Sequence, residues 1–240
     1  MNILTKNIFT GLALYVIAVS NVYASGPKPT EPSGPSSNVA WDMPQIKFVR
    51  GGGPSRGKEL NKKLACASCH GEKGAATADN WPSIAGQKAT YTYKMLIDYR
   101  DEKRAGTVTS NLMVKLAKQM TEQEMADISA YYASFSLPPA TRPKVASKEE
   151  VEKILPLLTR GDGKRLLAPC LSCHGTNAEG NIMDIPALAG QRAEYFRKTM
   201  KEFKTGARHN DVYARMRYIS KALTDNEINA LAQYFAEMKN

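Results

Sequence analysis

The 240-residue sequence predicts an all-α protein of two tandem domains, each built from about three main helices. Two blocks of the first half recur in the second half in the same order. WPSIAGQKATYTYKML at 81–96 matches IPALAGQRAEYFRKTM at 185–200, and MTEQEMADISAYYASF at 120–135 matches LTDNEINALAQYFAEM at 223–238. Apolar residues in these blocks repeat at helical spacing, and no run alternates as a strand would. Each copy is therefore expected to be one folding unit.

The helices can be placed from their ends and their apolar faces. TEQE at 121–124 and TDNE at 224–227 are capping boxes, in which the Thr and Glu side chains satisfy free backbone amides at a helix start. They predict the last helix of each copy. Apolar periodicity predicts helices over 88–104 and 191–205, and further helices over 56–66 and 160–169 should lead into the two cysteine motifs.

The first residues have the pattern of a cleavable secretory signal peptide, 1–24. Lys6 precedes an apolar run of 12 residues at 8–19, and VYA at 22–24 supplies small residues ahead of a cut after Ala24. An uncleaved anchor is the alternative, but the run is shorter than the roughly 20 residues of a spanning helix. The pattern predicts a periplasmic protein in an oxidising compartment.

Composition divides the rest of the chain. Residues 25–47 are rich in Pro, Gly and Ser and predict a flexible leader. An N-terminal domain is expected over 48–137, a proline-containing linker over 138–148 and a C-terminal domain over 149–240.

The chain is basic, with a formal net charge of +10 that is spread along it rather than gathered in an arm. This charge favours acidic partners or an anionic membrane surface, or else is a basic solvated surface with no particular partner. Lys62, Lys63, Lys88 and Arg192 are candidates for steering an acidic partner. Nucleic acid is not expected as a partner in the predicted compartment.

All four cysteines lie in two matching hexamers, CASCHG at 66–71 and CLSCHG at 170–175. A four-cysteine zinc site usually has its two pairs about 15–20 residues apart, and zinc gives no role to the adjacent histidine. A thioredoxin-like exchange motif needs preceding strands, which the sequence lacks. A disulfide across two residues closes too short a loop to stabilise much.

Covalent haem fits better, because C-x-x-C-H is the attachment signature of c-type haem. One helical turn places two thiols below the two vinyl groups of a porphyrin and directs the following histidine at the iron. The sequence thus predicts two covalently bound haem c groups. The expected thioether residues and iron ligands are Cys66, Cys69 and His70 in the first copy, and Cys170, Cys173 and His174 in the second.

A low-spin iron also needs a sixth ligand, commonly methionine or a second histidine. Met113 and Met216 each stand seven residues before the block that begins the last helix, and are the predicted ligands. His209 is an alternative to Met216, although the first copy has no counterpart. Methionine as core filler remains the other interpretation, and suits Met120, Met125, Met200 and Met238.

A haem-ligating histidine usually donates its other N–H to a backbone carbonyl. Pro82 and Pro186 each follow the histidine by 12 residues and are candidates for supplying that carbonyl. A proline that only shapes its loop is the other interpretation.

On these motifs the chain resembles a class I cytochrome c duplicated in tandem, and most resembles the dihaem cytochrome c4 family. The matching pieces are the two hexamers, PSIAGQ and PALAGQ, FKTGARHND, and the methionine ahead of each capped helix, over roughly 55–136 and 158–239. The resemblance implies two haem domains that face each other with His/Met iron ligands. It also implies a periplasmic electron carrier, peripherally associated with the membrane and serving terminal oxidases. The leader and the segment 145–158 are longer than the family's.

The expected function is outer-sphere electron transfer rather than enzymatic catalysis, because two six-coordinate irons leave no open position for a substrate. The redox partners would be a quinol-oxidising complex or dehydrogenase and a terminal oxidase. The alternative is the electron-accepting cytochrome subunit of a thiosulfate or sulfide dehydrogenase, a sulfur-oxidising partner. A dihaem enzyme such as a peroxidase is a third reading, and needs one iron to lose its distal ligand.

Overall fold

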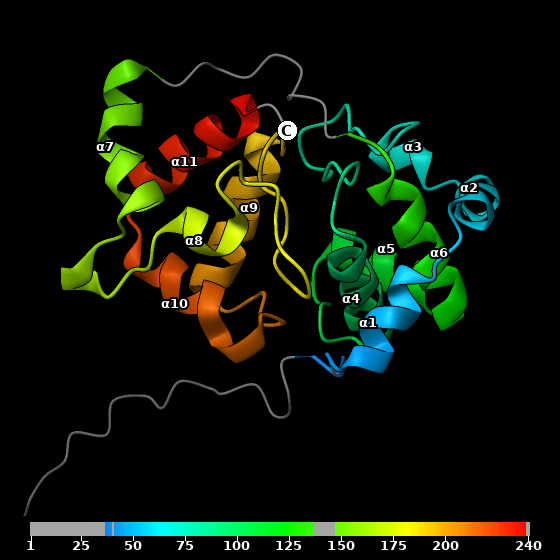
Figure 1. Ribbon diagram of the computed structural model, residues 1–240. Helices are drawn as coiled ribbons and strands as arrows, with labels where there is room; N and C mark the ends of the chain where they lie inside the picture. Colours follow the sequence, from blue (N-terminus) through cyan, green and yellow to red (C-terminus); the bar gives the residue numbers. More distant parts are fainter. Residues whose placement is uncertain (1–36, 40, 137–146, 239–240) are drawn as a thin grey trace, which may run out of the picture. The chain divides into compact units, whose positions relative to one another are not determined.

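Helices make up the regular structure of the protein, which we describe from a computed structural model for residues 37–39, 41–136 and 147–238 (Figure 1). The first repeat contains α1 (Met43–Arg50), α2 (Pro54–Lys63), α3 (Ala67–His70), α4 (Ala89–Arg100), α5 (Val108–Ala117) and α6 (Glu122–Ala133). The second contains α7 (Lys148–Thr159), α8 (Cys170–His174), α9 (Ala193–Thr205), α10 (Arg215–Ala222) and α11 (Asp225–Glu237). Short 3-10 turns occupy Gly163–Arg165 and Val212–Ala214.

Within the described residues, the only β pairing is one isolated bridge, Asp162 with Leu167. The predicted all-α class is confirmed. Both capping boxes are present: Thr121 accepts from the Glu124 amide at the start of α6, and Thr224 accepts from the Glu227 amide at the start of α11.

The first repeat is organised around the close approach of α2 to α6. Gly57 makes this approach possible, because a Cβ there would lie 2.2 Å from the Asp127 carbonyl oxygen. Helix α4 packs on the same α6 and buries Tyr93 and Leu96 in a core shared with Met125. The close contact of α2 and α6 fixes where the chain enters the first cysteine motif.

The second repeat has an equivalent core between α7, α9 and α11. Leu158 of α7 is fully buried, and Phe196 of α9 packs against Phe235 of α11 with ring centroids 5.6 Å apart. An ion pair joins the segment before the cysteine motif to the last helix in each repeat. These pairs are Arg56 with Asp127 at 2.6 Å and Arg165 with Glu227 at 2.9 Å.

The expected flexible leader, 25–47, differs from the structure where it can be described. Residues 25–36 lie outside the described residues, but α1 begins at Met43, inside the predicted leader. Asp42 caps α1 by accepting from the Gln45 amide at 2.8 Å, and Ile46 and Val49 are buried. The apolar residues of this short helix cover the α4 and α6 surface, so the first domain extends further toward the N-terminus than predicted.

The helix expected over 160–169 is wrong. The helix before the second cysteine motif is α7, which begins at Lys148 after the Ser147 cap, and residues 160–169 form turns around the 162–167 bridge. Asp162 explains the break, because its carboxylate accepts from the backbone amides of Lys164 and Arg165 and holds a tight turn. The expected linker, 138–148, lies outside the described residues except for its last two positions.

The predicted signal peptide, 1–24, also lies outside the described residues. Among the helices that are described, none combines the length and the apolar character needed to cross a bilayer.

Candidate functional site

Each cysteine motif forms a single helical turn. In the first, the His70 amide donates to the Cys66 carbonyl at 3.1 Å, so both thiols and the imidazole project from one turn. The glycine that closes the hexamer is required by the backbone. Gly71 has φ +80°, and a Cβ there would lie 2.0 Å from the Ala75 carbonyl oxygen. The motif is thus a preformed turn that ends abruptly after the histidine.

The two histidines are oriented by the prolines named from the sequence. His70 Nδ1 lies 3.0 Å from the Pro82 carbonyl oxygen, and His174 Nδ1 lies 2.8 Å from the Pro186 carbonyl oxygen. A carbonyl only accepts, so Nδ1 carries the proton and Nε2 keeps its lone pair. Burial lowers the pKa of both imidazoles, and the hydrogen bonds to the carbonyls offset part of that effect. Both rings are therefore neutral and are oriented by the bond at Nδ1, which leaves the Nε2 lone pair able to bind a metal.

All four thiols are free. Burial raises the pKa of Cys66, and raises that of Cys170 to about 11. The first cysteine of each motif is thus an apolar, protonated thiol, whereas Cys173 is exposed. Each pair thus consists of two thiols followed by a histidine, the arrangement of the c-type haem attachment signature.

A cavity of 510 Å³ extends between the two motifs, with walls from both repeats. Its walls include core side chains such as Leu96, Ile128 and Phe196. All residues predicted for the sites line it: Cys66, Cys69, His70, Pro82, Met113, Cys170, Cys173, His174, Pro186 and Met216. The structure therefore brings the predicted residues of both copies to one cavity.

The two candidate methionines occupy short helices ahead of the last helix of each repeat. Met113 lies in α5 and Met216 in α10, and each is partly buried against its own core cluster. The other interpretation of methionine, core filler, describes Met125 and Met200, which are 0% and 4% exposed. His209, the alternative to Met216, does not line the cavity.

Sequence reasoning missed a set of cationic and phenolic side chains on the cavity wall. Arg104 donates to the Tyr195 hydroxyl at 2.9 Å, and Arg208 donates to the Tyr91 hydroxyl at 3.2 Å. Arg104 and Arg208 are 104 positions apart, as are Tyr91 and Tyr195, so each arginine contacts the tyrosine of the other repeat. The 104-residue offset between the cysteine motifs, applied to the arginines and tyrosines, would have identified these pairs.

The charge of these two arginines indicates whether a haem fits the cavity. Arg208 is 6% exposed, and within the described part of the chain neither Arg104 nor Arg208 forms an ion pair with a carboxylate. Burial alone would raise the pKa of Tyr195, yet the two guanidinium groups lower it to about 8. The wall thus carries positive charge that lacks an anion. A haem has two carboxylates and an apolar ring, and both match this cavity.

The glutamines of the repeated AGQ blocks join the two repeats reciprocally. Gln87 bonds both the amide and the carbonyl of Ala187, at 3.0 and 2.8 Å. Gln191 does the same to Ser83, with both distances 2.9 Å. Arg192, expected from the sequence to steer a partner, is instead buried and bonds the Thr77 carbonyl and Asp79. These buried bonds hold the two halves of the cavity together.

Comparison with known proteins agrees with this geometry. The protein-family model described as cytochrome c matches the chain twice, at residues 54–136 and 161–239. Cytochrome c4 of Thiocapsa roseopersicina is 34% identical over 186 residues, which cover 76% of this chain and 91% of that protein. The thiosulfate dehydrogenase electron acceptor of Stutzerimonas stutzeri is 31% identical, over 73% of this chain and 79% of that protein.

Solved structures give the same answer. Reduced cytochrome c4 from Pseudomonas stutzeri superposes with a TM-score of 0.69 at 27% identity, covering 78% of this chain and all (100%) of that one. Thiosulfate dehydrogenase from Marichromatium purpuratum superposes with a TM-score of 0.66 at 28% identity, but the match covers only 40% of that chain.

Fold and site together define an electron-transfer protein with two helical domains and two covalently bound haem c groups. The chain belongs to the cytochrome c family, as a dihaem member of its cytochrome c4 group. Haem iron supplies the chemistry, since it takes up and releases one electron between its ferrous and ferric states.

Proposed function

We propose that in each domain two cysteines would hold the haem through thioethers, and one histidine and one methionine would bind its iron. In the first domain these are Cys66, Cys69, His70 and Met113, and in the second Cys170, Cys173, His174 and Met216. The observation that carries this assignment is that both sets line one cavity, each with an imidazole whose Nδ1 is already bonded to a proline carbonyl. Arg104 and Arg208 would neutralise the haem carboxylates.

The protein would act as a carrier rather than as an enzyme. A histidine and a methionine on each iron would leave no position for a substrate, and methionine ligation would raise the reduction potential. Cys173 is exposed, and Leu112, at the rim of the cavity, is 42% exposed. These groups would form an apolar contact surface where electrons enter and leave, and the basic chain would attract acidic partners.

The partners proposed first are a quinol-oxidising complex or dehydrogenase as donor and a terminal oxidase as acceptor, in the periplasm and in peripheral contact with the membrane. The cytochrome c4 relatives and the signal-like sequence of residues 1–24 support this proposal.

A second candidate function is to accept electrons from a sulfur-oxidising dehydrogenase. Two relatives at 31% identity carry the name thiosulfate dehydrogenase electron acceptor, and the superposition on a thiosulfate dehydrogenase favours the same role.

One experiment separates these functions. The oxidised holoprotein is mixed with purified thiosulfate dehydrogenase and thiosulfate, or with a quinol-oxidising complex and quinol, and haem reduction is followed at several ionic strengths. Reduction by only one donor, slowing as salt is added, identifies the partner. Hydrogen peroxide turnover by the protein alone, with a high-spin oxidised spectrum, would contradict the carrier role.

A further inference from the structure

Lys94 and Asp98 form a buried ion pair on α4 that the electron-transfer assignment does not use. Their side chains are 2% and 0% exposed and lie 2.5 Å apart. Asp98 also accepts from the Ser37 hydroxyl at 2.6 Å. A buried ion pair is costly to desolvate, so such a pair needs further hydrogen bonds to be stable.

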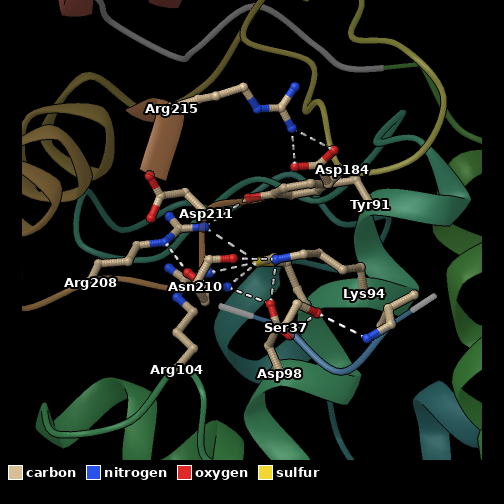
Figure 2. A network of polar contacts seen from close by, with 12 residues as sticks. Ser37, Tyr91, Lys94, Asp98, Arg104, Asp184, Arg208, Asn210, Asp211 and Arg215 are labelled. Carbon is tan, nitrogen blue, oxygen red and sulfur yellow. Dashed lines mark hydrogen bonds and ion pairs between the residues drawn. The ribbon is translucent and has the colours of Figure 1, made fainter. Parts of the chain in front are cut away.

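Those bonds come from the other repeat. Lys94 Nζ donates to the Asn210 carbonyl at 2.5 Å, and the Asn210 amide group donates to Asp98 at 2.6 Å. Asn210 is itself 0% exposed, and its remaining side-chain oxygen accepts from Arg208 at 3.0 Å. Figure 2 shows Lys94, Asp98 and Asn210 bonded together, with Ser37 beside Asp98. The first repeat thus fixes both the backbone and the side chain of one residue in the second.

Asn210 lies in the segment that leads to Met216. The next residue, Asp211, accepts from the backbone amide and the guanidinium of Arg217, at 2.9 and 2.8 Å. Between them, Tyr213 and Ala214 have φ values of 56° and 55°, a strained conformation that the surrounding contacts must hold. A short, hydrogen-bonded path therefore runs from the Lys94–Asp98 pair to the residue beside Met216.

A weaker contact of the same kind runs from the second repeat to the first. Lys198 stands 104 positions after Lys94, and its Nζ donates to the Thr109 hydroxyl of α5 at 3.0 Å, one helical turn before Met113. Lys198 lies 3.9 Å from Glu202, and their side chains are 38% and 19% exposed. Each repeat thus bonds the methionine-bearing segment of the other, but only one of the two contacts is fully buried.

We propose that Lys94 is a positioning residue for Met216: the first domain holds the methionine ligand of the second haem in place through the Lys94–Asp98–Asn210 cluster. This inference rests on the proposed ligation by Met113 and Met216. Lys198 has the equivalent role for Met113. Its effect on methionine ligation is smaller, because water can replace an exposed contact. Arg215, which bonds Asp184 at 2.7 Å, anchors α10 within its own domain, so loss of Lys94 weakens ligation without abolishing it.

The test compares the Lys94→Met and Lys198→Met holoproteins with the parent. NMR of the reduced protein gives each iron-bound methionine its own shifted methyl signal, and the two are assigned by Met113 and Met216 variants. We follow both signals during heating. In Lys94→Met the Met216 signal should disappear at a lower temperature while the Met113 signal keeps its midpoint, and Lys198→Met should shift the Met113 signal slightly.

The Met113 signal is an internal control for general destabilisation. Equal shifts of both signals in Lys94→Met, or no shift in either, would overturn the positioning role. Absence of two methionine signals from the parent protein would instead refute the proposed ligation. If Lys94→Met does not take up haem, Asn210→Ala decides. It keeps the carbonyl that Lys94 bonds and removes the side-chain bonds of Asn210 to Asp98, Arg208 and Met95. Amide exchange over residues 206–217 should then be about tenfold faster than in the parent, and unchanged exchange would contradict the proposal.

Discussion

Arg104 donates a hydrogen bond at 2.9 Å to the hydroxyl of Tyr195, which belongs to the other repeat. The same contact occurs in reverse, because Arg208 donates to the hydroxyl of Tyr91 at 3.2 Å. The duplicated sequence therefore builds a duplicated interface, in which each domain supplies a cation to the wall of the shared cavity. The arginine–tyrosine contacts and the reciprocal glutamine bonds between the domains can both be tested by substitution.

Removing either arginine should lower a reduction potential. A cation near a haem favours the reduced state, which carries one positive charge fewer than the oxidised state. Arg208→Gln and Arg104→Gln should therefore lower the potential by on the order of tens of millivolts. Voltammetry measures this shift, and Lys118→Gln is a suitable control, because Lys118 is an exposed lysine that pairs with Glu102. A potential equal to that of the parent in both arginine variants would exclude a haem near these guanidinium groups.

Gln191→Ala should destabilise the contact between the domains. The substitution leaves the buried amide and carbonyl of Ser83 without their partners, which costs about 2–4 kcal/mol for the two hydrogen bonds. The free energy of unfolding in denaturant measures this cost. The control is Gln119→Ala, at an exposed position, and should change little. Similar stability of the two variants would show that the glutamine contact contributes little to the free energy of unfolding.

Gly57→Ala should be among the more damaging single substitutions in the first domain. The added methyl group would lie 2.2 Å from the Asp127 carbonyl oxygen and 2.7 Å from the Tyr131 Cβ, so α2 and α6 must separate. Overpacking of this kind costs about 1–3 kcal/mol. Thermal unfolding measures it, with Gly163→Ala as the control, since a Cβ at Gly163 meets nothing within 4 Å. Equal melting temperatures for the two variants would contradict the close packing.

Asp127 should contribute stability that depends on pH. Burial alone would raise the pKa of Asp127, but hydrogen bonds from Arg56 and Gly53 outweigh burial and hold the pKa below its ordinary value of 3.8. A carboxylate with a lowered pKa stabilises the fold above that ordinary value, and the contribution is lost as the pH falls through the folded pKa. Asp127→Asn should therefore be about 1–2 kcal/mol less stable at neutral pH. The difference should shrink below pH about 4, and a difference that is independent of pH would refute this account.

The sequence was sufficient for the local features that repeat, but not for the repeated arginine–tyrosine contacts between the domains. The capping boxes located α6 and α11, the shared offset located both cysteine turns, and the 12-residue spacing located Pro82 and Pro186 beside the histidines. These features are local, so a short stretch of chain determines them.

Most of the features that were missed depend on contacts between distant residues. Helix α1 has only Ile46 and Val49 as buried residues. Their burial depends on the surface of α4 and α6, which are distant in the sequence. The turn around Asp162 is a local exception: its carboxylate accepts from the amides of Lys164 and Arg165, and this ends the helical course expected over 160–169. Arg192 looked like a surface charge because its partners, Thr77 and Asp79, lie in the other repeat.

The most direct test of the account is the number of haems and of iron-bound methionines per chain. Pyridine haemochrome analysis gives the first, and the methionine–iron charge-transfer band of the oxidised protein gives the second. We predict two haems per polypeptide, with a band that loses about half of its intensity in Met113→Ala or in Met216→Ala and vanishes in the double variant. A single haem per chain, or a band that survives both substitutions, would contradict the account.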